Sequence, residues 1–323
     1  MHMADALVSP AVAGVAGMAA VGLIVTASKK IRSGTDESVI PLMGVMGAFI
    51  FAAQMINFAI PGTGSSGHIV GGILLGALLG PWAGFLTLSS VLVVQCLIFA
   101  DGGLMALGCN ILNMAAVSTL VAYPFVYRPI AGEGLKTWRI MTAAVVASVV
   151  GLELGACLVT AETELSGVTA LPWKSFFALM CSIHFFIGIG EGIATAAVLY
   201  FVRKYRPDLF AGHHEAKDGK RSYKKAVWVF LGLAVLVGGV LSFVASSNPD
   251  GLEWSIQSIT GLPELASSSG ALGEAFDSVQ KTTSFLPDYE SSWSGIIGCA
   301  IVVALVWVVA CVITRRRTSV DKI

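Results

Sequence analysis

The feature that most constrains this chain is a series of long apolar windows with few charged residues inside them. A helix needs about 20 residues to cross the hydrocarbon core of a bilayer. The windows lie at residues 8–28, 39–59, 82–100, 103–127, 138–160, 173–202, 225–245 and 294–314. With 55% apolar and only 12% charged residues, the chain has too little charge to cover a water-exposed surface. The sequence therefore predicts an all-α, polytopic membrane protein.

A shorter apolar segment, His68–Leu79, follows the Gly/Ser-rich run at 61–67 and ends at a Gly-Pro pair. Lys and Arg collect in short cytoplasmic loops, so their distribution indicates whether this segment crosses the bilayer. If it crosses and the N-terminus lies outside, all 20 basic residues except Lys174 and Lys281 fall on the inner side. If the short segment does not cross the bilayer, three more basic residues fall on the outer side. We therefore expect a bundle of about nine transmembrane helices, with the N-terminus outside and the C-terminus cytoplasmic.

The loops divide the chain into two units. Residues 206–224 are polar and basic, which predicts a cytoplasmic linker between a larger unit, 1–205, and a two-helix unit, 225–323. Within the second unit, the segment 246–293 contains many acidic residues and the single basic residue Lys281. We expect this segment to be an extracytoplasmic loop.

Composition and missing motifs exclude several classes of function. The formal net charge of +0 leaves no basic surplus for a nucleic-acid partner. The sequence has no GxxxxGK[ST] loop, so the chain lacks an ATPase site of its own. It also has no GxSxG elbow and no HExxH motif, so we expect neither an enzyme nor a permanent cofactor. The six cysteines lie in apolar runs without a CxxC pair, which is typical of small apolar residues in membrane helices.

The first two residues, Met1 and His2, offer an unusual chelate. No basic segment precedes the first apolar window, so we expect no removable signal peptide and a mature chain that begins at Met1. The α-amine of Met1 and the backbone amide nitrogen of His2 would close a five-membered ring on a metal ion. The same amide nitrogen and His2 Nδ1 would close a six-membered ring. Planar nitrogen coordination of this kind suits Ni(II) or Cu(II).

A fourth nitrogen donor is needed in the plane, and His68 is the best placed because it follows a glycine-rich run on the same predicted side. A histidine at position 2 can also be incidental, and His68 can simply cap a helix, so both interpretations stay open. His184 and Glu191 are seven residues apart and share one helix face. They could orient helix packing, pair with each other or form a transit site; packing is the interpretation we favour.

Three sequence runs resemble the CbiM/NikM family of substrate-binding subunits of energy-coupling-factor transporters. They are the opening MHMADAL, the run AQMINFAIPGTGSSGHIVGGILLGALLGPWAG at about 52–84, and VLVVQCLIFADGGLMALGCNILNM at 91–114. A fourth run, SIHFFIGIGEGIAT, lies at 182–195. The resemblance covers about 1–205, and the motif NPDGLE at 248–253 resembles a fused NikN/PDGLE-type partner segment.

The resemblance implies a metal site formed by Met1, His2 and His68, the same groups that the chelate rings select. It also implies a transmembrane coupling subunit (CbiQ/NikQ-like) and cytosolic ATPases (CbiO/NikO-like), which fits the missing ATPase loop. The expected function is metal capture for an energy-coupling-factor ABC importer of Ni(II) or Co(II). The expected location is a bacterial or archaeal inner membrane, in contact with lipid.

A second hypothesis is a proton-coupled secondary transporter of a divalent metal. It would use Asp101, Glu153 or Glu191 as proton carriers, because ionisable residues within membrane segments are costly and usually functional. Uptake that survives deletion of the ATPases would favour this alternative.

Overall fold

The computed structural model describes residues 1–34, 39–134, 136–211, 224–241, 245–265, 270–289 and 293–320. Over these residues the chain is almost entirely helical, and six helices are long and apolar enough to cross a membrane. They are Pro10–Ser33, Pro81–Phe99, Leu107–Ala131, Thr137–Ser166, Trp173–Tyr205 and Ser294–Ile313. The predicted class, an all-helical membrane protein, is confirmed. The total of nine spans and the orientation of the termini stay predictions.

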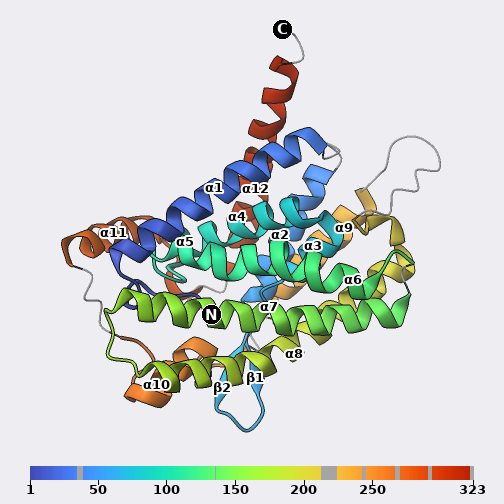
Figure 1. The fold of residues 1–323 in the computed structure, drawn as a ribbon. Helices are drawn as coiled ribbons and strands as arrows, with labels where there is room; N and C mark the ends of the chain where they lie inside the picture. The colour runs from blue at the N-terminus through green and yellow to red at the C-terminus, as the bar shows by residue number, and fades with distance from the viewer. Residues whose placement is uncertain are drawn as a thin grey trace.

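Residues 1–211 form a series of helices and one small hairpin, which projects from the lower edge of the molecule in Figure 1. The elements are η1 Asp5–Leu7, α1 Pro10–Gly34, α2 Ile40–Gln54, β1 Phe58–Ile60, β2 Ser65–Gly67, α3 Gly72–Leu79, α4 Pro81–Phe99, α5 Leu107–Asn110, η3 Ile111–Tyr127, α6 Arg128–Ala131, α7 Thr137–Ser166, α8 Trp173–Tyr205 and η4 Pro207–Leu209. The span Leu107–Ala131 is continuous through α5, η3 and α6.

The second part of the chain has fewer elements. They are α9 Lys224–Gly239, α10 Gly251–Thr260, α11 Gly270–Thr283, η6 Pro287–Tyr289 and α12 Ser294–Val320. Most of the predicted linker, residues 212–223 with His213 and His214, lies outside the described residues. The predicted extracytoplasmic segment contains α10, α11 and η6, and is therefore largely helical over the residues described.

Predicted boundaries differ from the helix ends at several places, and three predicted segments give helices that are shorter than expected. The window 39–59 gives α2, which ends at Gln54 because the chain then turns into the antiparallel β1–β2 hairpin. The window 225–245 gives α9, which ends at Gly239. The short helix does not begin at His68 but at Gly72, after Gly71 adopts a left-handed conformation with φ of 81°. Glycine reaches this region without the steric penalty of a Cβ atom, so Gly71 can end the non-helical loop.

Side-by-side packing arranges the long helices around the N-terminus. Helices α7 and α8 run together along one side, and α2 packs against both α9 and α12 (Figure 1). The N-terminus lies inside the group of helices, whereas the C-terminal end of α12 projects away from it (Figure 1). The short helix α3 is buried along its whole length, as expected for an apolar helix surrounded by others.

The hairpin joins the two parts of the chain. Its strands pair Phe58 with Gly67 and Ile60 with Ser65. Main-chain Ser66 N donates to Pro249 O at 2.8 Å, and Ser66 Oγ donates to Asn248 O at 2.7 Å. The start of α10 is therefore fixed against the loop that precedes His68.

Helices α9 and α12 approach closely at Gly238 and Gly295. A Cβ atom at Gly295 would lie 2.2 Å from the carbonyl oxygen of Gly238, which is backbone and cannot rotate away. We expect Gly295→Ala to lower the free energy of unfolding by about 1–3 kcal/mol, the usual cost of overpacking. Gly239→Ala is the control, because its Cβ would make only ordinary contact with Ile296 at 3.5 Å. Thermal denaturation in detergent measures both, and equal melting temperatures would contradict this account.

Candidate metal centre

The N-terminal segment is fixed inside the bundle by hydrogen bonds to the main chain of Met3. Met3 N donates to Asn110 Oδ1 at 2.7 Å, and Met3 O accepts from Gly103 N at 2.9 Å and Asn110 Nδ2 at 3.2 Å. Met3 has no exposed surface. Three hydrogen bonds to one residue determine where the preceding two residues lie.

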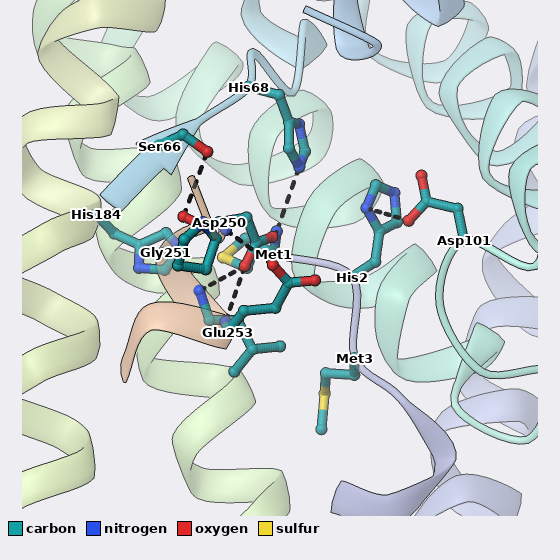
Figure 2. A network of polar contacts seen from close by, with 12 residues as sticks. Met1, His2, Met3, Ser66, His68, Asp101, His184, Asp250, Gly251 and Glu253 are labelled. Atoms are coloured by element: carbon teal, nitrogen blue, oxygen red, sulfur yellow. Dashed lines mark hydrogen bonds and ion pairs between the residues drawn. The ribbon is translucent and has the colours of Figure 1, made fainter. Parts of the chain in front are cut away.

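The α-ammonium group of Met1 lies between two side chains from distant parts of the sequence (Figure 2). Its nitrogen is 3.3 Å from His68 Nε2, and it forms an ion pair with Asp250 Oδ2. The Met1 side chain packs against Gly155, where a Cβ atom would come within 2.7 Å of the Met1 methyl carbon. The glycine therefore leaves the room that the first residue occupies.

His68 is present in the form that a metal requires. Its Nδ1 lies 3.2 Å from Ile69 O, so Nδ1 carries the proton and Nε2 presents its lone pair to the Met1 amine. Burial, together with the adjacent ammonium group, lowers the pKa of His68 to about 3. The imidazole therefore stays neutral at physiological pH.

Glu191 on α8 holds the loop that follows His68. Its two carboxylate oxygens accept from Val70 N at 2.8 Å and Gly71 N at 3.0 Å, and its side chain is buried. Gln54 Nε2 donates to Val70 O at 2.8 Å. His184 lies on the same buried face of α8, but its Nδ1 is 2.8 Å from Met180 O within its own helix. The shared face was predicted, whereas the bond from Glu191 to the His68 loop was not.

His2 stacks on His68 and turns its chelating nitrogen toward a carboxylate. The ring centroids are 5.2 Å apart with an interplanar angle of 22°. His2 Nδ1 is 3.1 Å from Asp101 Oδ1, and Tyr289 Oη donates to Asp101 Oδ2 at 2.6 Å. Burial lowers the pKa of His2, although the negative charge of Asp101 opposes this shift. The predicted six-membered chelate thus needs His2 Nδ1 to leave Asp101.

Asp250 is the residue that the sequence analysis missed. It is the N-cap of α10: Oδ1 accepts from Leu252 N at 2.8 Å and Glu253 N at 2.9 Å, while Oδ2 pairs with the Met1 amine. Burial alone would raise the pKa of Asp250, but the ammonium group and His68 hold it below its usual range. The spacing Asp250-x-x-Glu253 indicates a helix start, and nothing in that local pattern points to a residue 249 positions away.

The structure thus brings together Met1, His2 and His68, the three residues proposed from the sequence. Over the described ranges, no three His, Cys, Asp or Glu side chains are grouped so that they could hold a metal ion. The proposed donor set of Met1, His2 and His68 differs from such a cluster of side chains, because two of its nitrogen atoms are the terminal amine and a backbone amide.

The fold and this site define a polytopic membrane protein with a nitrogen-rich pocket around its own N-terminus. The chain belongs to the CbiM family, described as a cobalt uptake substrate-specific transmembrane region, which matches residues 2–209. The PDGLE domain family matches residues 224–315. The resemblance found in the sequence is confirmed, and the family is one of transport proteins rather than enzymes.

Individual relatives extend the similarity over nearly the whole chain. A putative fused nickel transport protein NikMN of Archaeoglobus fulgidus is 33% identical over 306 residues, covering 94% of this chain and 96% of that protein. The cobalt transport protein CbiM of Geobacter sulfurreducens is 28% identical over 246 residues, covering 73% of this chain and 68% of that protein. A solved structure described as a truncated transition metal transporter is 30% identical with a TM-score of 0.56, covering 63% of this chain and 99% of that one.

The hydrogen bonds of Glu191 lead to a test of the His68 loop. Glu191→Gln retains one acceptor oxygen but places an amide group opposite the second backbone N–H. We expect a loss of about 1–3 kcal/mol in the free energy of unfolding, because a buried donor is left without an acceptor. The control is Glu164→Gln on α7, where the side chain is exposed. Denaturation midpoints measure the effect, and a midpoint for Glu191→Gln no lower than that of the control would contradict this role.

Proposed function

We propose that this chain is the metal-capture subunit of an importer for Ni(II) or Co(II), and that Met1, His2 and His68 bind the ion. The observation that supports this most directly is the approach of the Met1 amine to within 3.3 Å of His68 Nε2, with the His2 ring stacked beside it. Membership of a cobalt uptake family and similarity to fused nickel transport proteins support the same class of substrate.

In the proposed complex, the four donors are the Met1 amine, the His2 amide nitrogen, His2 Nδ1 and His68 Nε2. The Met1 ammonium group now donates toward His68 Nε2, so the metal would replace a proton between two nitrogens that already face each other. Binding would release protons from the amine and the amide, as expected when a metal takes protonated ligands. His2 Nδ1 would exchange Asp101 for the ion.

Nickel and cobalt differ in their preferred geometry. A plane of four nitrogen donors suits Ni(II), and the fused nickel relatives favour the same ion. Co(II) can occupy the same donors, and the family description names cobalt. We therefore propose both ions as substrates.

The remaining parts of the proposal concern the whole importer. Residues 1–205 would form the metal-binding unit, 206–224 a cytoplasmic linker and 225–323 a two-helix partner unit; the matches at 2–209 and 224–315 support this division. A transmembrane coupling subunit and cytosolic ATPases would supply the energy for release. The chain would have its N-terminus outside, in the cell membrane of a bacterium or archaeon.

Replacement of the two histidines tests the donor set. We expect His2→Ala and His68→Ala each to weaken Ni(II) or Co(II) binding by more than about 100-fold, because losing a donor exceeds the effect of outer-shell changes. His184→Gln is the control, a third buried histidine whose Nδ1 lies against Met180 O. Titration calorimetry and metal analysis of purified protein measure binding. One tightly bound equivalent in His2→Ala would refute the N-terminal chelate.

The terminal amine is tested separately by blocking it. A tag before Met1 removes the primary amine and displaces the first residue from its packed position beside Gly155, so we expect no tight binding. A tag after Ile323 leaves the site intact and serves as the control. Intact mass spectrometry establishes which terminus is present, and metal content is measured on the same sample. Undiminished binding by the N-terminally tagged protein would rule out the amine as a donor.

A further inference from the structure

A cavity of about 650 Å³ lies beside the candidate metal centre. His2 and His68 form part of its wall, and so does the loop 100–103. Residues 263–265 between α10 and α11, residues of these helices and Tyr289 of η6 also line it. The cavity is therefore shared by the metal-binding region and the PDGLE domain.

The charged groups that line this cavity are mostly acidic. Among the described residues that line it, the carboxylates are those of Asp5, Asp101, Asp250, Glu253, Glu264 and Asp277, and the ammonium group is that of Lys281. Burial raises the pKa of Asp5, and the negative charge of Asp277 adds to this shift, so the acids on different elements influence each other. Asp250 is already paired with the Met1 amine, and Asp101 is already paired with His2.

A buried and unpaired oxygen is a second, independent indication of a ligand. Gln54 is only 5% exposed and lines the cavity. Its Nε2 donates to Val70 O, which leaves Oε1 buried without a hydrogen-bond partner among the described residues. Such groups are costly unless a water or ligand satisfies them.

We propose that this cavity, which we call the vestibule, collects a hydrated divalent cation before the ion reaches the chelate. A cation with six waters needs roughly 200 Å³, at about 30 Å³ per water, so the vestibule has room for it. The bound waters would donate to the carboxylates and to Gln54 Oε1. The ion would be held through its water shell, because no three His, Cys, Asp or Glu side chains of the described residues are grouped closely enough to coordinate it directly.

The vestibule has a kinetic consequence. A cavity lined by one sign of charge raises the local concentration of the opposite ion and accelerates its association, and salt weakens the effect. Removing the carboxylates of Glu264 and Asp277 should therefore slow the association of the metal ion without changing its rate of dissociation from the chelate. The destination of the ion rests on the function proposed above, whereas collection in the vestibule depends only on these acids and the cavity.

The first experiment measures the association rate of Co(II) by stopped flow on the full chain in detergent. We expect the double variant Glu264→Gln, Asp277→Asn to associate about three- to tenfold more slowly at low ionic strength, with an unchanged dissociation rate. Glu274→Gln is the matched control, because it removes an exposed acid from α11 that does not line the cavity. Lys281→Gln should accelerate association. Equal slowing by Glu274→Gln, or no slowing by the double variant, would overturn the proposal.

The second experiment separates the vestibule from the chelate. His2→Ala removes a proposed donor, and weak Mn(II) binding is then followed by electron paramagnetic resonance as the loss of the free hexaaqua signal. We expect weak binding to persist in His2→Ala and to fall about tenfold when Glu264→Gln and Asp277→Asn are added. Failure of the chelate alone would leave this weak binding unchanged. Absence of weak Mn(II) binding in both proteins would overturn the vestibule and leave the chelate standing.

Discussion

The rest of the site depends on the burial of a charged α-ammonium group among apolar helices. An isolated charge of this kind is very costly to remove from water, and it persists only where it is paired and hydrogen-bonded. Asp250 provides the opposite charge and His68 Nε2 a neutral acceptor. Because both partners are needed at one point, the hairpin loop and the start of α10 must meet at the N-terminus. The bonds from Ser66 to Asn248 and Pro249 hold them there.

The two parts of the chain consequently share one site. The CbiM family match ends at residue 209, yet the Met1 amine is paired with a residue of the PDGLE domain. Tyr289 extends this connection, since its hydroxyl holds the carboxylate that faces His2. Gln280 on α11 adds a further contact by donating to Gly102 O at 2.8 Å. The PDGLE domain thus helps to form the surroundings of the first two residues, beyond adding helices to the bundle.

Chelation and pairing compete for the same atoms in this arrangement. The Met1 amine is bonded to Asp250, and His2 Nδ1 to Asp101, so two of the proposed donors already have partners. In the complex proposed above, a metal ion would replace those contacts, and the carboxylates would stay nearby as partners for the amine and the imidazole once the ion leaves. Under that proposal, the exchange of partners would favour reversible loading and release at a site made of strong nitrogen donors.

The sequence by itself determined the membrane class and most of the long helices, because window length and hydropathy are local properties. It also indicated Met1 and His2, since chelate-ring size follows from covalent geometry, and His68, since this histidine follows a glycine-rich run on the same predicted side. Only the tertiary structure decided that Asp250 pairs with the amine, that Asp101 holds His2 and that Glu191 fixes the His68 loop. Each of these contacts joins residues that lie far apart in the sequence, and buried polar groups find their partners through the packing of helices. No local pattern encodes that packing.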